Sequence, residues 1–151
     1  ETVTLFTDGS YDRLTRHGGW AAILMAPSLA SPVRGSGPLK RTTNNRAELI
    51  AVIRGLERLA TPVHVHIVSD SKYVTFGIVE GVPKWKAQGW RAGSGRRKRT
   101  LQNADLWKKL DALMEPHSVN CEWVRGHSGD KWNEECDRLA VAAMERPAFF
   151  V

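Results

Sequence analysis

The chain has 151 residues, the usual size of one globular domain, and its hydrophobic fraction of 42% and charged fraction of 25% are those of an ordinary folded protein. This composition excludes wholesale disorder, and no apolar run approaches the roughly 20 residues that a membrane helix needs. The start of the chain lacks the basic and then apolar layout of a secretory signal. Cys121 and Cys136 are too few for a disulfide scaffold and too far apart for a Cys-x-x-Cys motif. We therefore expect a single cytoplasmic domain over residues 1–151, with two reduced thiols and no membrane partner.

The positive charge of the chain is concentrated in one segment. Twenty-two Lys and Arg residues against sixteen Asp and Glu residues give a formal net charge of +6. The stretch 84–99 contains seven of the basic residues and no acidic one, and without it fifteen basic residues stand against sixteen acidic ones. A local basic patch favours a polyanionic partner, and the alternative is a solvated loop that serves solubility.

The predicted elements alternate between strands and helices. In chain order, the hydrophobic periodicity and the turn signals predict a strand at 1–8, a turn at Asp8-Gly9-Ser10, strands at 19–26 and 33–39, a helix at 46–60 capped by Asn44 or Asn45, a strand at 64–69, a short helix at 72–79 ended by Gly81 and Pro83, an irregular basic segment at 84–100, a helix at 101–114, a strand at 119–124, a loop at 126–130 and a helix at 131–145. Three strands followed by alternating helices and strands indicate an α/β domain with a mixed sheet.

Four acidic residues lie where a fold alone does not require them. Asp8 and Asp70 each end a predicted strand, where ligands bind in α/β sheets, although an Asp there also starts a turn. Glu48 lies in the first turn of its helix and tilts toward the core, although an acid there also favours the helix dipole. Asp137 shares an apolar stripe of the last helix, where a structural ion pair is the alternative.

If these four acids lay close together, a positive charge would be needed to offset the repulsion between their carboxylates. A hard divalent cation such as Mg²⁺ prefers carboxylate and water oxygens and often keeps a phosphate ligand from the substrate. Two such ions about 4 Å apart can stabilise both the attacking and the leaving oxygen of a phosphodiester displacement. The acids and the basic segment together therefore suggest metal-assisted phosphodiester chemistry.

Six blocks of residues carry a resemblance to a known family. They are Thr7-Asp8-Gly9-Ser10, Thr42-Thr43-Asn44-Asn45-Arg46-Ala47-Glu48-Leu49, Ser69-Asp70-Ser71-Lys72-Tyr73-Val74, Trp85…Gly89-Trp90, Asn103-Ala104-Asp105-Leu106-Trp107 and Trp123-Val124-Arg125-Gly126-His127-Ser128-Gly129…Asn133-Glu134…Asp137. In their order and spacing the chain resembles ribonuclease H of type 1, the RNA–DNA hybrid endonuclease, over nearly its whole length. The resemblance implies a ribonuclease H-like α/β fold, in which helices flank a five-stranded mixed sheet and residues 84–100 form a basic protrusion; residues 146–151 would be a tail.

The resemblance also implies the chemistry. Asp8, Glu48, Asp70 and Asp137 would be the catalytic carboxylates that bind two Mg²⁺ ions, which Mn²⁺ can replace, and His127 would be the mobile-loop histidine that assists proton transfer or product release. The implied reaction is hydrolysis of the RNA strand of an RNA–DNA hybrid by a two-metal-ion mechanism, which gives 5′-phosphate and 3′-hydroxyl ends. We expect a monomer. Two alternatives stay open: the ribonuclease H part of a larger reverse-transcriptase-type protein, and a non-catalytic hybrid-binding module of the same fold.

The resemblance assigns contacts to both strands of the hybrid. Asn44 and Asn45 match residues that read the minor groove, where an amide can both donate to and accept from the 2′-hydroxyl of RNA. Gly9 and Ser71 match contacts to the RNA strand, and Thr43 matches part of a pocket for a phosphate of the DNA strand. Further expected substrate contacts are Ser10, Lys72, Lys84, Trp85, Lys86, Trp90, Arg96, Arg97, Lys98, Arg99 and Asn133.

Several tryptophans are open to two interpretations. Trp90 is expected to anchor the protrusion, whereas Trp85 either anchors it or stacks on the substrate. Trp107 and Trp123 are expected in the core. Trp132 either contacts the substrate or packs beneath the histidine loop.

Overall fold

A five-stranded mixed sheet forms the centre of the molecule in the computed structural model, which describes residues 1–93, 95–97 and 99–145. The strands are β1 (Thr2–Tyr11), β2 (Gly18–Met25), β3 (Val33–Leu39), β4 (His64–Ser69) and β7 (Ser118–Trp123), in the order β3-β2-β1-β4-β7. The first three strands pair antiparallel, and β4 and β7 extend the sheet in parallel from β1. The predicted α/β domain with a mixed sheet is confirmed.

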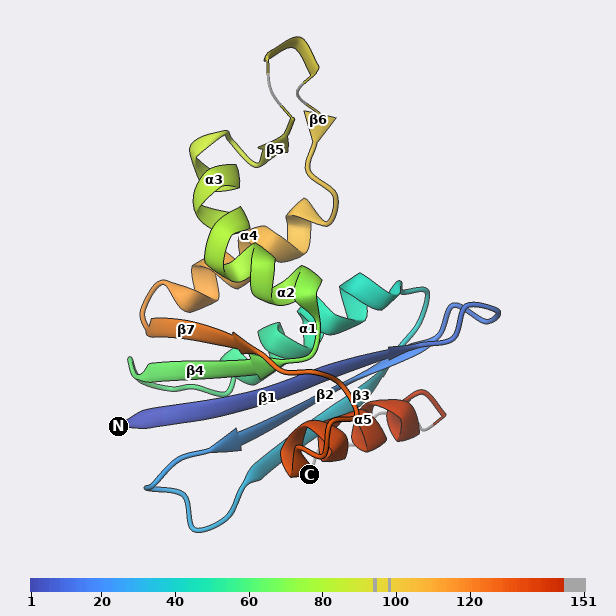
Figure 1. The fold of residues 1–151 in the computed structure, drawn as a ribbon, viewed down its shortest axis with the longest axis vertical. Coiled ribbons are helices and arrows are strands. Elements are labelled where there is room, and N and C mark those ends of the chain that lie inside the picture. The colour runs from blue at the N-terminus through green and yellow to red at the C-terminus, as the bar shows by residue number, and fades with distance from the viewer. Residues whose placement is uncertain (94, 98, 146–151) are drawn as a thin grey trace.

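Helices cover the sheet from both sides (Figure 1). Helices α1 (Asn44–Leu56) and α4 (Ala104–Met114) pack on one face, and α5 (Lys131–Ala143) packs on the other. Because side chains alternate along a strand, Leu5 of β1 joins the core under α1, whereas Phe6 joins the core under α5. Trp107 of α4 is fully buried in the larger core, as the sequence predicts.

The helix predicted to end at Gly81 and Pro83 instead continues. Helix α2 (Lys72–Phe76) passes through a π-helical turn, η1 (Gly77–Gly81), into α3 (Val82–Ala87). Pro83 lies in the first turn of α3, where a missing N–H is tolerated. A Cβ at Gly77 would overlap the ring of Trp107, and one at Gly81 would overlap the ring of Trp85. These glycines therefore make room for two tryptophan rings rather than stopping a helix.

The basic segment forms an arm that points away from the sheet (Figure 1). It begins within α3 and continues as an antiparallel pair, β5 (Arg91–Ala92) and β6 (Arg99–Thr100), with a 3₁₀ turn, η2 (Gly95–Arg97), between them. The prediction of an irregular segment is therefore only partly right. At the root of the arm, Trp85 and Trp90 are half-buried against the main core, and the Trp85 and Trp107 rings lie 5.1 Å apart. Both tryptophans therefore anchor the arm to the body of the protein. Lys98 and the predicted tail 146–151 lie outside the described residues.

Four local predictions are wrong. Asp8-Gly9-Ser10 is not a turn, because β1 continues through these residues and pairs them with Ala21, Trp20 and Gly19 of β2. Helix α1 is capped by Thr43, not by Asn44 or Asn45, and ends at Leu56 rather than at residue 60. Trp123 is not in the core, because it is 43% exposed at the end of β7.

Two expectations drawn from composition can be compared with the structure. Cys121 and Cys136 are both free thiols, and burial raises the pKa of Cys121 to about 12. In residues 1–93, 95–97 and 99–145, no helix combines the length and the apolar character that crossing a bilayer requires.

Candidate active site

The acids come together where β1 extends beyond its pairing with β4. The pairing of β1 with β4 ends at Phe6 and Val68, so Asp8 lies just beyond the paired region and Asp70 directly follows β4. Helix α1 approaches β1 at Gly9, where a Cβ would lie 2.5 Å from the main-chain nitrogen of Glu48. Since real Cβ atoms do not come that close, glycine at this position lets the first turn of α1 reach the end of the sheet.

Three of the four predicted carboxylates converge on one point. One carboxylate oxygen from each of Asp8, Glu48 and Asp70 lies within 4.8 Å of the other two. Asp8 is 4% exposed and Glu48 is 7% exposed, so two of the acids are buried. Asp8 accepts a hydrogen bond from the Gly9 N–H at 2.9 Å, but the buried Oε1 of Glu48 has no hydrogen-bond partner among the described residues. A buried carboxylate oxygen without a donor is suited to binding a cation.

The fourth acid and the histidine act on this cluster electrostatically. Burial, followed by the charges of Asp70 and Asp137, raises the pKa of Asp8 to about 8. Burial and the charges of Asp8 and Asp70 raise the pKa of Glu48 well above its ordinary value. Burial and the charge of Asp137 also raise the pKa of Asp70, and His127 opposes that shift. In the absence of a cation, the pKa values of all three clustered carboxyl groups are therefore raised above their ordinary values.

Asp137 belongs to the last helix, α5, and His127 to the loop that precedes it. Asp137 is half-buried on α5, whose first turn is capped by Asp130. His127 is exposed in the loop between β7 and α5, and its backbone adopts a left-handed conformation, with φ of 55°. The loop position of His127 agrees with the sequence prediction.

Trp123 contacts Asp70 in a way that the sequence interpretation missed. Its indole N–H donates to the main-chain oxygen of Asp70 at 2.9 Å, and the Lys72 ammonium lies 4.9 Å from the centre of its ring. Behind the carboxylate, a Cβ at Gly126 would lie 2.9 Å from Oδ2 of Asp70. No sequence signal indicated this contact, because it depends on the parallel register that sets Ser69 of β4 opposite Trp123 of β7.

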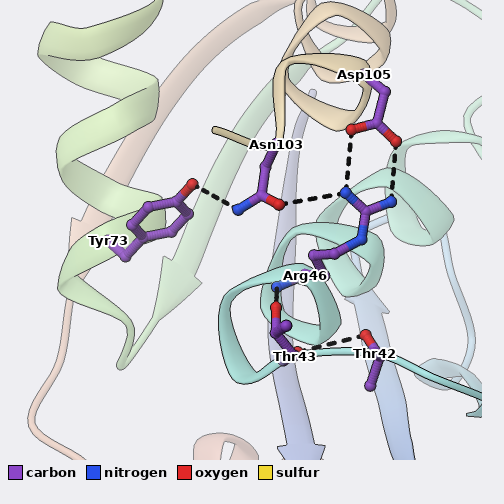
Figure 2. A network of polar contacts seen from close by, with 6 residues as sticks. All are labelled: Thr42, Thr43, Arg46, Tyr73, Asn103 and Asp105. Carbon is purple, nitrogen blue, oxygen red and sulfur yellow. Dashed lines mark hydrogen bonds and ion pairs between the residues drawn. The ribbon is translucent and has the colours of Figure 1, made fainter. Parts of the chain in front are cut away.

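The predicted hybrid contacts near the acids occupy the starts of two helices. Thr43 caps α1 by accepting the Arg46 N–H at 3.2 Å (Figure 2), and Ser71 caps α2 by accepting the Val74 N–H at 3.2 Å. Asn44 is exposed and Asn45 is half-buried in the first turn of α1.

The other predicted contacts differ in accessibility. Ser10 is buried and its hydroxyl donates to the Ala140 carbonyl at 2.7 Å, while Asn133 is 2% exposed. Lys84, Lys86, Arg96 and Arg99 are exposed. Lys86 forms an ion pair with Asp111 at 3.2 Å. Lys98 and the side chain of Arg97 lie outside what the structure describes. Trp132 packs against Phe6 on the α5 side of the sheet, and the centres of their rings lie 6.3 Å apart.

The comparisons with known proteins agree with this geometry. The sequence model of the family described as RNase H matches residues 1–145. The chain belongs to the ribonuclease H family. It is 43% identical over 144 residues to the ribonuclease H of Rhodopirellula baltica, covering 95% of this chain and 91% of that protein. It is 42% identical over 145 residues to the ribonuclease H of Cupriavidus necator, covering 96% of this chain and 97% of that protein. The predicted resemblance to ribonuclease H is thus confirmed.

Two solved structures share the fold of this chain. The crystal structure of LC9-RNase H1, a type 1 RNase H with the type 2 active-site motif, matches with a TM-score of 0.78 at 31% identity, covering 95% of this chain and 72% of that chain. A foamy viral protease-reverse transcriptase in complex with RNA/DNA hybrid matches with a TM-score of 0.79 at 23% identity, covering 95% of this chain and 20% of that one. The second match supports the ribonuclease H-like fold alone.

Proposed function

We propose that this chain is an endonuclease that uses divalent metal ions to hydrolyse the RNA strand of RNA–DNA hybrids. The observation that carries the proposal is the group of three carboxylates within 4.8 Å of one another, in a chain of the ribonuclease H family. A hybrid-binding module without catalysis would have no need for acids whose burial and mutual repulsion raise their pKa values.

The donor set fits Mg²⁺. Asp8, Glu48 and Asp70 would hold the metal, with Asp137 as a fourth acid beside them, because hard cations prefer carboxylate oxygens. Mn²⁺ shares this preference and is expected to substitute. When two ions are bound, they supply an activated water and stabilise the leaving 3′-oxygen, so that the products carry 5′-phosphate and 3′-hydroxyl ends.

The protein residues orient the reaction. The buried Asp8 and Glu48 are fixed by β1 and α1, so their oxygens need little reorganisation during turnover. His127 is exposed beside Asp70, where its imidazole could donate a proton to the leaving 3′-oxygen or assist product release.

The hybrid would lie across the starts of α1 and α2. Asn44 and Asn45 offer amides to the minor groove, Gly9 and Ser71 contact the RNA strand, and Thr43 contacts a phosphate of the DNA strand. Lys72 and the protrusion residues Lys84, Trp85, Lys86, Trp90, Arg96, Arg97, Lys98 and Arg99 add affinity without base specificity. Ser10 and Asn133 are the least accessible of the proposed contacts. A monomeric state and a cytoplasmic location stay predictions.

The test is cleavage of a hybrid whose RNA and DNA strands carry different labels. We expect internal cuts in the RNA strand alone with Mg²⁺, and no cuts with EDTA. Cutting of the DNA strand would contradict the assigned substrate, and cutting in EDTA would contradict the role of metal.

A further inference from the structure

Arg46 lies at the centre of a polar network that joins three helices. Its guanidinium donates to both carboxylate oxygens of Asp105, at 3.0 and 2.9 Å, and to the side-chain oxygen of Asn103 at 3.2 Å (Figure 2). The Asn103 amide donates to the Tyr73 hydroxyl at 3.0 Å, and the Trp107 indole donates to the same hydroxyl at 3.1 Å. The first turn of α1, helix α2 and the start of α4 are thereby tied together.

Asn103 is held in a conformation that this network explains. It precedes α4 with a left-handed backbone, φ 60°, which is unfavourable for a residue with a side chain. Asparagine tolerates this conformation and often caps a helix with its side chain, yet here the side chain forms no capping hydrogen bond. Its amide instead bridges Arg46 and Tyr73.

The network joins residues on either side of the basic protrusion. Tyr73 precedes residues 84–100 in the chain, and Asn103 and Asp105 follow them. The root of the protrusion is closed by a main-chain hydrogen bond from Leu101 to Trp90 at 3.4 Å. Residues that flank the protrusion on both sides are thus tied to the start of α1, which carries Asn44 and Asn45.

Arg46 is poorly suited to binding a phosphate itself. Its charge is paired bidentately with Asp105, and it lowers the pKa of that carboxyl, so the pair persists at neutral pH. Both terminal nitrogens of its guanidinium donate within the protein.

We infer that Arg46 is a positioning residue: through Asp105, Asn103 and Tyr73 it fixes the basic protrusion relative to the carboxylate cluster, so that one hybrid can contact both. This inference rests on the proposed function for the identity of the ligand. It adds a residue that acts on substrate affinity without touching the substrate or the acids.

The test measures hybrid affinity in EDTA as a function of salt concentration. Arg46→Met is expected to weaken binding about fivefold at low salt and to lower the slope of log affinity against log salt by about one, because a misplaced protrusion neutralises fewer phosphates. Arg54→Met is the matched control, since Arg54 lies on the same helix and pairs with Glu57 at 3.4 Å outside the network. It is expected to leave the slope unchanged.

A double-mutant cycle separates positioning from direct contact or lower stability. In a background with Arg96, Arg97, Lys98 and Arg99 replaced by Gln, Arg46→Met is expected to change affinity less than about twofold. Asp105→Asn, at a side chain 64% exposed, provides a second variant that removes the ion pair with little effect on folding. An equal loss of affinity in both backgrounds, or an unchanged salt slope for both variants, would overturn the inference. Wild-type protein that binds hybrid but never cleaves it would contradict the proposed function instead, because no turnover enters this test.

Discussion

At the residue scale, the acids depend on close neighbours that carry no charge. Gly9 permits the approach of α1 that buries Glu48, and Gly126 leaves space behind the carboxylate of Asp70. Asp8, Glu48 and Asp70 could be predicted from the sequence, because the blocks that resemble ribonuclease H assign all three, although each acid alone also has a turn or helix-dipole explanation. Trp123 could not, since its role depends on the register that sets it opposite Ser69.

Replacing Asp8 by Asn should stabilise the metal-free protein at high pH. The fold raises the pKa of Asp8 from 3.8 to about 8, so the folded carboxyl holds its proton more tightly than the unfolded one. Its stabilising contribution is complete below about pH 4 and disappears as the pH rises through about 8. In EDTA at about pH 9 we expect Asp8→Asn to have the higher free energy of unfolding, by on the order of 2 kcal/mol.

Urea denaturation at several pH values measures this effect. The difference between Asp8→Asn and wild type should shrink toward about pH 4. A difference of equal size at both ends of the pH range would show that the raised pKa of Asp8 is not its cause. Added Mg²⁺ should stabilise the wild type more than the variant, because ligands stabilise the state that binds them.

Replacing Trp123 by Phe should weaken metal binding. The variant keeps a ring but cannot donate the hydrogen bond to the main-chain oxygen of Asp70. Outer partners of metal ligands affect affinity, so we expect the Mg²⁺ dissociation constant, measured by calorimetry, to rise about threefold or more. Phe76→Leu, at an exposed position on α2, is the control. An unchanged Mg²⁺ affinity would leave Trp123 without the positioning role assigned to it.

At the element scale, tertiary pairing overrides local signals. Asp8-Gly9-Ser10 has the composition of a turn, yet β2 supplies partners that keep β1 extended through it. Gly81 and Pro83 have the composition of a helix end, yet the chain accommodates both through a π-helical turn. The alternation of helices and strands was predictable because hydrophobic periodicity is a local property, whereas these continuations depend on distant residues.

Replacing Gly77 by Ala should destabilise the protein. The added methyl group would overlap the fully buried ring of Trp107, and a packed core relaxes poorly around extra volume. We expect the free energy of unfolding to fall by about 3 kcal/mol. Val79→Ala, at an exposed position in the same turn, should change it by less than about 0.5 kcal/mol. Similar values for the two variants in thermal or urea denaturation would mean that the Trp107 ring can shift.

At the scale of the whole molecule, the basic protrusion and the carboxylate cluster belong to different parts of the fold. The protrusion extends from one side of the fold (Figure 1). The clustered carboxylates belong to β1, to the residue after β4 and to α1. The charge distribution was readable from the sequence, since it follows from counting. The distance between arm and acids was not, because it depends on how α2, α3 and α4 stack.

Neutralising the protrusion should weaken binding more than turnover. With Arg96, Arg97, Lys98 and Arg99 changed to Gln, hybrid affinity should fall steeply at low salt, and the salt slope should flatten by roughly one for each phosphate that the arm no longer neutralises. The rate at saturating hybrid should change little, since the acids are untouched. Binding titrations at several salt concentrations check this. An unchanged slope would make the arm a solubility feature.

The most direct measurement is hybrid cleavage by Asp70→Asn in saturating Mg²⁺. Asp111→Asn is a matched control, because it replaces an acid of α4 whose partner is Lys86, away from the cluster. We predict that Asp111→Asn cuts the RNA strand at close to the wild-type rate, while the rate of Asp70→Asn falls at least about a hundredfold. Undiminished cutting by Asp70→Asn would contradict the assignment of the carboxylate cluster as the active site.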